Sequence, residues 1–196
     1  MQRLISEEHV KEELLTLDRM VMIGAAGRNC GKTSLALALI KAWRGRFPMI
    51  ALKVTTIHDA GGSCVRGHAG CGTCTRIKGS FDLVEETEEQ GDKDTRKLLA
   101  SGVGRVFWLR CHKEHLAEGI EHFLSLVPDD AVIICESNSL REVVKPGRFI
   151  MMKNPEDTSV KPSAAAVMDL ADDVVENDFG EGLERFAMGM SAPAFA

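Results

Sequence analysis

Ala26-Gly27-Arg28-Asn29-Cys30-Gly31-Lys32-Thr33 follows the apolar run 20–23 and leads into a stretch rich in Ala and Leu. A glycine followed by a lysine and a hydroxyl residue is typical of a Walker A phosphate-binding loop, whose backbone N–H groups surround an anion. In such a loop the lysine reaches the β- and γ-phosphates and the hydroxyl binds Mg²⁺, while the start of the next helix favours negative charge. The order strand, loop, Gly-Lys-Thr and helix therefore predicts a nucleotide site.

The loop departs from the strict pattern at Ala26, where that pattern has glycine, and Gly24 and Gly27 flank this position. We expect alanine to be accepted because its side chain is the smallest after glycine. The alternative is a glycine-bearing turn that binds nothing. The residues expected to hold the nucleotide are Gly27, Arg28, Asn29, Cys30, Gly31, Lys32, Thr33 and Ser34, with Thr33 also binding Mg²⁺.

Length and composition favour one domain spanning residues 1–196, since 196 residues with 44% hydrophobic side chains suffice for a substantial core. The net charge of −5 argues against nucleic acid as the main partner. No apolar run approaches the roughly 18 residues of a membrane span, and the start of the chain lacks the layout of a signal peptide. We therefore expect a cytoplasmic protein with no membrane partner.

Apolar runs alternate with helical patterns along the chain, which predicts an α/β protein with the three-layer fold of P-loop NTPases and a mostly parallel sheet. The expected strands are 21–23, 49–54, 103–109, 131–135, 148–152 and 173–175, with a short extended piece at 81–84. The expected helices are 6–18, 32–43, 94–100, 113–126, 164–171 and 182–188. Ligands bind at the carboxyl ends of the strands in such sheets, so residues that follow the strands should meet at one edge.

A loop inserted at about 56–80 is rich in Gly, Cys and His and has no apolar period. Cys64, His68, Cys71 and Cys74 form a C-x3-H-x2-C-x2-C cluster. Zinc would take these four side chains as a tetrahedral site, and an iron–sulfur cluster would use the three cysteines. A reversible disulfide between Cys71 and Cys74, or thiols without a function, are the alternatives.

Three carboxylates are candidates for work beside the nucleotide. Glu136 follows a buried strand and is the best placed to support Mg²⁺ or its water; Asp59 and Asp94 come next. Lys53 either faces the phosphates or is an ordinary surface lysine. Lys32 is expected to neutralise charge on the phosphates during catalysis, with Glu136 and Asp59 as its catalytic partners. Nothing in the sequence decides between GTP and ATP.

Several segments together resemble the molybdopterin-guanine dinucleotide biosynthesis protein B family. They are the phosphate loop, the stretch from Lys53 to His58-Asp59, Lys93-Asp94-Thr95 followed by 100–103, and Ile134-Cys135-Glu136-Ser137. The resemblance implies a GTP-binding accessory protein of molybdenum-cofactor maturation. The chain departs from the family in carrying Ser137 where the family has glycine, and in its Cys/His loop.

These features favour a P-loop protein that hydrolyses GTP or ATP and serves the maturation of a metal cofactor or a metalloenzyme. Its expected cofactors are Mg²⁺ with the nucleotide, and Zn²⁺ or an iron–sulfur cluster in the Cys/His loop. Its expected partners are the nucleotide and a metalloenzyme or cofactor-synthesis protein, and a homodimer stays open. The alternatives are a small-molecule kinase with the 56–80 loop as a lid, and a non-catalytic metal-binding module.

Overall fold

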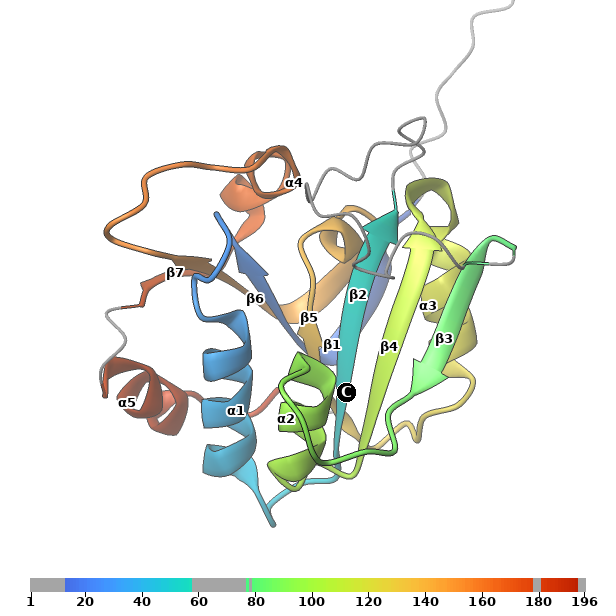
Figure 1. Ribbon diagram of the computed structural model, residues 1–196, viewed down its shortest axis with the longest axis horizontal. Coiled ribbons are helices and arrows are strands. Elements are labelled where there is room, and N and C mark those ends of the chain that lie inside the picture. Colours follow the sequence, from blue (N-terminus) through green and yellow to red (C-terminus); the bar gives the residue numbers. More distant parts are fainter. Residues whose placement is uncertain (1–12, 58–76, 78, 178–180, 194–196) are drawn as a thin grey trace, which may run out of the picture.

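The computed structural model describes residues 13–57, 77, 79–177 and 181–193. Its strands form one seven-stranded sheet in the order β3-β4-β2-β5-β1-β6-β7 (Figure 1). Neighbouring strands run parallel except for β3, which pairs antiparallel with β4. The predicted α/β class with a mostly parallel sheet is confirmed.

The elements of the fold have the following bounds. The strands are β1 Leu15–Ala25, β2 Met49–Ile57, β3 Phe81–Glu85, β4 Arg105–His112, β5 Val132–Glu136, β6 Val144–Lys153 and β7 Asp173–Glu176. The α-helices are α1 Lys32–Trp43, α2 Asp94–Ala100, α3 Leu116–Leu124, α4 Pro162–Ala165 and α5 Gly182–Gly189. Three short 3-10 turns are η1 Lys113–His115, η2 Ser139–Glu142 and η3 Met168–Leu170.

Two hydrophobic cores lie on opposite faces of the sheet and make the fold three-layered. Val21 and Ile23 of β1 pack with α1, α2 and α5, and these helices lie in front of the sheet in Figure 1. Met20 and Met22 point to the other face, where they pack with α3 and α4. This alternation follows from the two-residue period of a strand, since successive side chains point to opposite faces.

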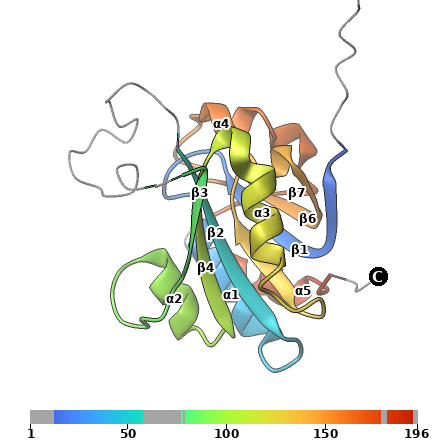
Figure 2. The same cartoon turned by 90° about the vertical axis from the view of Figure 1, so that its right-hand side faces the viewer.

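The predicted helix over 6–18 is wrong in its second half, because β1 begins at Leu15; residues 6–12 lie outside the described chain. Leu15 and Leu17 pack against the α3 core from one face of the strand. The first part of β1 already pairs with β6, and the register between the two strands then shifts. Figure 2 shows this first part running down one side of the molecule. Beside this shift a Cβ on Gly147 would come within 2.0 Å of the Asp18 carbonyl oxygen.

Several predicted boundaries also need correction. The strand expected at 103–109 begins and ends later, as β4, and the helix expected at 113–126 opens with η1 and ends with α3. The helix expected at 164–171 is broken into α4 and η3. The helices expected at 32–43 and 94–100 agree with α1 and α2.

Six parallel strands, β1, β2, β4, β5, β6 and β7, direct their carboxyl ends toward the same edge of the sheet. This edge carries the predicted phosphate loop after β1 and Glu136 at the end of β5. Within the described ranges, no helix combines the length and apolar character that crossing a bilayer requires.

Candidate nucleotide-binding site

The turn between β1 and α1 contains two residues in the left-handed region, Asn29 with φ 55° and Gly31 with φ 89°. Both residue types are among those that adopt this conformation most readily. Left-handed residues within a tight turn allow nearby N–H groups to converge on a concave anion site. The backbone of this turn is therefore compatible with the predicted phosphate loop.

The turn is anchored to the segment around β6. The Ala26 N–H donates to the Met152 carbonyl at 2.8 Å, and the Lys161 N–H donates to the Ala26 carbonyl at 2.9 Å. Within the turn the Gly27 N–H donates to Cys30 Sγ at 3.3 Å. Cys30 is buried, so its thiol stabilises the turn from inside.

Asn138 holds the end of β1 and was not predicted as a site-forming residue. Its Oδ1 accepts from the Ala25 N–H at 2.8 Å and its Nδ2 donates to the Ala25 carbonyl at 3.0 Å, as a neighbouring strand would do. A Cβ on Gly24 would lie 2.9 Å from Asn138 Oδ1, which explains the glycine there. Ser137 also ties the strands together, since its N–H donates to the Ile23 carbonyl at 3.1 Å.

Helix α1 begins without the usual stabilising groups. In the described chain its N-cap residue Gly31 has no side-chain cap, and the first turn has no acidic residue. Lys32 occupies the first helical position, where the helix dipole disfavours a cation by some tenths of a kcal/mol. The first-turn N–H groups lack carbonyl partners within the helix. An anion bound at this point would accept hydrogen bonds from these N–H groups and would offset the charge of Lys32.

Lys32, Thr33, Glu136, Lys53 and Asp94 gather beside the start of α1. Lys53 lies directly opposite Glu136 in the β2–β5 ladder, and its Nζ forms an ion pair with Asp94 Oδ2. Glu136 is only 3% exposed, and its Oε1 has no hydrogen-bond partner among the described residues. The site thus contains a buried carboxylate oxygen without a described partner, in a side chain that both Lys53 and Lys32 influence electrostatically.

Burial shifts the pKa values of Glu136 and Lys32 in the directions that favour the neutral form of each side chain. Burial raises the pKa of Glu136, although Lys53, a hydrogen bond from Thr33 and Lys32 act in the opposite direction. Burial lowers the pKa of Lys32, against the attraction of Glu136. Bound Mg²⁺ would favour the carboxylate and bound phosphate would favour the ammonium.

The structure brings Lys32, Thr33 and Glu136 together, as expected from their positions. Lys53 and Asp94, which the sequence left undecided, contact each other at the same place. The predicted nucleotide ligands Gly27, Arg28, Asn29, Cys30, Gly31, Lys32, Thr33 and Ser34 all lie in the turn or the first turn of α1.

The remaining predicted site residues, Asp59, Cys64, His68, Cys71 and Cys74, lie outside the described residues. In the part of the chain that is described, no three His, Cys, Asp or Glu side chains are arranged to hold a metal ion.

The other described cysteines are buried structural residues. Burial raises the pKa of the Cys111 thiol to about 11 and also raises the pKa of Cys135. A thiol with a raised pKa is a poor nucleophile at neutral pH, because the thiolate is the reactive form.

Comparisons with protein-family models, with curated proteins and with solved structures gave no match for this chain. The resemblance to the molybdopterin-guanine dinucleotide biosynthesis protein B family therefore stays a prediction from its motifs.

Gly31→Ala is expected to lower the free energy of unfolding by about 2–4 kcal/mol, from left-handed strain plus overpacking. The new Cβ would lie 2.1 Å from Nδ2 of the fully buried Asn177. Gly45→Ala is the matched control, because Gly45 has φ +75° and nothing within 4 Å of the added Cβ. Urea unfolding measures both variants. Equal losses would show that contact with Asn177 does not restrict position 31.

Proposed function

We propose that this protein binds a nucleoside triphosphate with Mg²⁺ and hydrolyses GTP or ATP. The observation that carries the proposal is the pairing of an uncapped helix start bearing Lys32 with the buried, partly unsatisfied carboxylate of Glu136. The helix start and the lysine suit phosphate oxygens, and the carboxylate with the Thr33 hydroxyl suits Mg²⁺ and its waters.

The residues of the site have distinct roles in this proposal. Backbone N–H groups from Arg28 to Thr33 surround the phosphates, and Lys32 neutralises charge on the terminal phosphate. Thr33 binds Mg²⁺, and Glu136 orients a water. That water oxygen bonds to the γ-phosphorus as the bond from phosphorus to the β,γ-bridging oxygen breaks, and the water proton passes to Glu136 or to a phosphate oxygen. Glu136 would accept the proton in its carboxylate form, which bound Mg²⁺ would favour.

Turnover of the purified protein tests the proposal. We expect Mg²⁺-dependent release of inorganic phosphate from GTP or ATP. Transfer of phosphate to an added small-molecule acceptor, with none to water, would favour the kinase alternative. No turnover with or without acceptors, together with tightly bound metal, would favour a non-catalytic metal-binding module.

We further propose that the hydrolysis serves maturation of a metal cofactor or a metalloenzyme, such as a molybdenum-cofactor-like pathway. The support is the motif resemblance and the position of the Cys/His segment in the chain. Ile57, before this segment, pairs with His112, and Phe81, after it, pairs with Cys111. Strand spacing puts these two points within about 10 Å of each other. The segment thus leaves and rejoins the sheet at the edge that carries Glu136.

Metal analysis tests the Cys/His part of the proposal. Anaerobically purified protein is expected to carry zinc, or to absorb visible light as an iron–sulfur cluster does, through Cys64, His68, Cys71 and Cys74. Cys71→Ser is expected to lose the metal, whereas Cys111→Ala, at a buried structural thiol, keeps it. Elemental analysis and absorption spectra measure this. Protein free of metal after anaerobic purification, or full retention by Cys71→Ser, would contradict a metal site there.

A further inference from the structure

The residue that lies opposite Lys53 in the sheet is not the residue that its side chain contacts. Lys53 lies directly opposite Glu136 on the neighbouring parallel strand, and the backbones of neighbouring strands are about 4.8 Å apart. Its ammonium instead pairs with Asp94 at the start of α2. The Lys53 and Asp94 side chains are 25% and 40% exposed, so solvent reaches the pair.

The order of the strands places Lys53 beyond Glu136 as seen from the phosphate turn. β1 carries the turn, β5 carries Glu136, and β2 carries Lys53, in that spatial order. A triphosphate whose Mg²⁺ lies between Thr33 and Glu136 would direct its terminal phosphate along this line. The Lys53 ammonium is also close enough to influence both Glu136 and Lys32 electrostatically. A diphosphate would end before it reaches Lys53.

We propose that Lys53 recognises the terminal phosphate of the nucleotide by leaving Asp94 and binding the γ-phosphate oxygens. Lys53 then distinguishes triphosphate from diphosphate, and Asp94 holds it aside while the site is empty. The inference rests on the nucleotide site proposed above, and on the buried Glu136 oxygen that has no hydrogen-bond partner among the described residues and that lies in a carboxylate influenced electrostatically by Lys53, Asp94 and Lys32.

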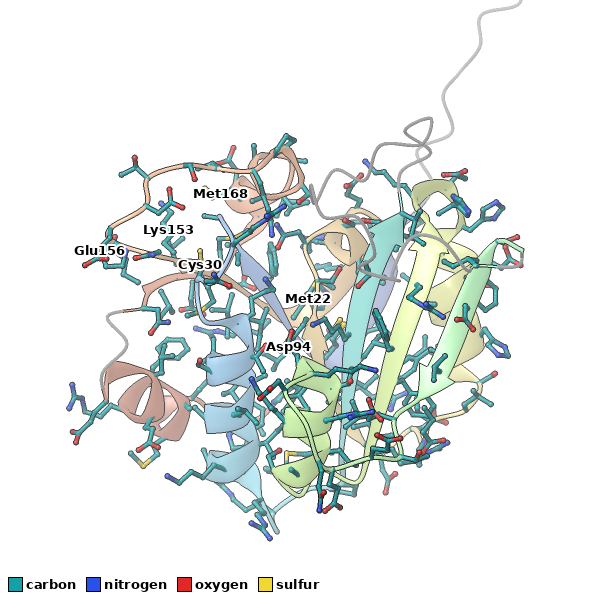
Figure 3. All side chains as sticks on the ribbon, in the orientation of Figure 1. Met22, Cys30, Asp94, Lys153, Glu156 and Met168 are labelled. Carbon is teal, nitrogen blue, oxygen red and sulfur yellow. The ribbon has the colours of Figure 1, made fainter. Side chains whose placement is uncertain are left out.

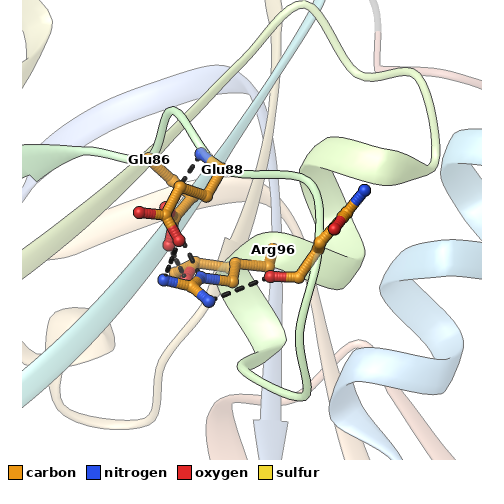
Figure 4. A network of polar contacts seen from close by, with 5 residues as sticks. Glu86, Glu88 and Arg96 are labelled. Atoms are coloured by element: carbon orange, nitrogen blue, oxygen red, sulfur yellow. Dashed lines mark hydrogen bonds and ion pairs between the residues drawn. The ribbon is translucent and has the colours of Figure 1, made fainter.

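The exchange would carry nucleotide state to α2. Figure 3 labels Asp94 at the end of α2 that lies near β2. The next residues of α2 are fixed to the preceding segment by a polar network, drawn around Arg96 in Figure 4. Thr95 Oγ1 donates to Glu86 Oε2 at 2.7 Å, and Arg96 forms an ion pair with Glu88. This network makes α2 and the segment before it one unit, and the Lys53–Asp94 pair links that unit to β2.

The test compares a non-hydrolysable triphosphate with the diphosphate of the same base, both with Mg²⁺, by calorimetric titration. Lys53→Ala is expected to weaken triphosphate binding by about 10–100-fold, the size of one charge-assisted contact, and to leave diphosphate binding unchanged. Lys53→Arg restores part of the preference. Asp94→Asn is expected to strengthen triphosphate binding several-fold, because it releases Lys53. Lys41→Ala, at an exposed ion pair with Glu184, changes neither affinity.

The outcomes separate the two proposals. Equal weakening of both nucleotides by Lys53→Ala, or no weakening, would overturn the role of Lys53 and leave the nucleotide site standing. A wild-type protein that binds neither nucleotide would overturn the site itself. If Lys53→Ala does not fold, Asp94→Asn decides, since unchanged or weaker triphosphate binding by that variant contradicts the exchange.

Discussion

Lys32→Ala is expected to weaken binding of the Mg²⁺-bound nucleoside triphosphate by about 100-fold or more, while the folded protein keeps its stability. Lys32 lies at the start of α1, where we propose that phosphate binds, and its ammonium is the cation expected to contact two phosphates. Charge-assisted contacts of this kind are each worth about 1.5–3 kcal/mol. Calorimetric titration of wild type and variant measures the loss.

Lys32→Ala should not lower the stability of the nucleotide-free protein, although it weakens nucleotide binding. Burial lowers the pKa of Lys32 in the folded state, so the folded state holds this proton less tightly than the unfolded chain does. The charged form therefore destabilises the empty protein below the folded-state pKa, and this penalty disappears as pH rises toward the unfolded value. We expect Lys32→Ala to unfold at the same urea concentration as wild type or at a slightly higher one.

Lys41→Ala is the matched control for Lys32→Ala, because it removes a lysine from the last turn of the same helix. Lys41 forms an exposed ion pair with Glu184 at 2.9 Å, and such pairs contribute only some tenths of a kcal/mol. Nucleotide affinity should not change in this variant. Retained tight binding by Lys32→Ala would contradict the role given to Lys32.

Glu136→Gln is expected to lower the rate of hydrolysis by about 100-fold or more, the usual size of a general-base effect. It should also stabilise the empty protein at neutral pH by about 1–2 kcal/mol, since it removes a buried charge with one unpaired oxygen. Phosphate-release assays measure the rate, and urea unfolding measures the stability.

The pH dependence of the stability gives Glu136→Gln a second signature. Burial raises the pKa of Glu136 in the folded state, so its contribution to stability falls as pH rises from the unfolded pKa through the folded one. The advantage of Glu136→Gln over wild type should therefore grow across that range.

Glu85→Gln is the control for Glu136→Gln, because the pKa of Glu85 is shifted in the opposite direction. The hydrogen bond from Arg105 lowers the pKa of Glu85, so its contribution is present above the unfolded pKa and is lost as pH falls through the folded one. Glu85→Gln should therefore be no more stable than wild type, and hydrolysis should be unaffected. A Glu136→Gln variant that hydrolyses nucleotide at the wild-type rate would contradict the role of that carboxylate.

Local signals in the sequence predicted the centre of the fold well. Helix α1 begins at Lys32, directly after Gly31, and continues through an Ala/Leu-rich stretch, so its bounds were predicted correctly. Glu136 could be placed because the apolar run before it is typical of a strand buried on both faces of a parallel sheet. The residue that ends such a strand lies at the edge where ligands bind. The prediction for the start of β1 was wrong. Leu14, Leu15 and Leu17 fit a helical period, but pairing with β6 makes this segment a strand.

Long-range contacts explain what the sequence could not predict in the site. Lys53 and Asp94 are 41 residues apart, and their contact depends on β2 pairing with β4 and on α2 packing against β4. Asn138 and Ala25 are 113 residues apart, and nothing near either residue indicates the pairing. The polar run Ser137-Asn138-Ser139 after a buried strand was the one signal for a structural role there.

Equilibrium titration of the wild-type protein with GTP and with ATP, in the presence of Mg²⁺, tests the central claim most directly. We predict saturable binding of at least one of the two nucleotides to a single site per chain, and loss of that binding when Lys32 is replaced by Ala. Folded wild-type protein that binds neither nucleotide at millimolar concentration would contradict the claim that the turn between β1 and α1 is a phosphate site.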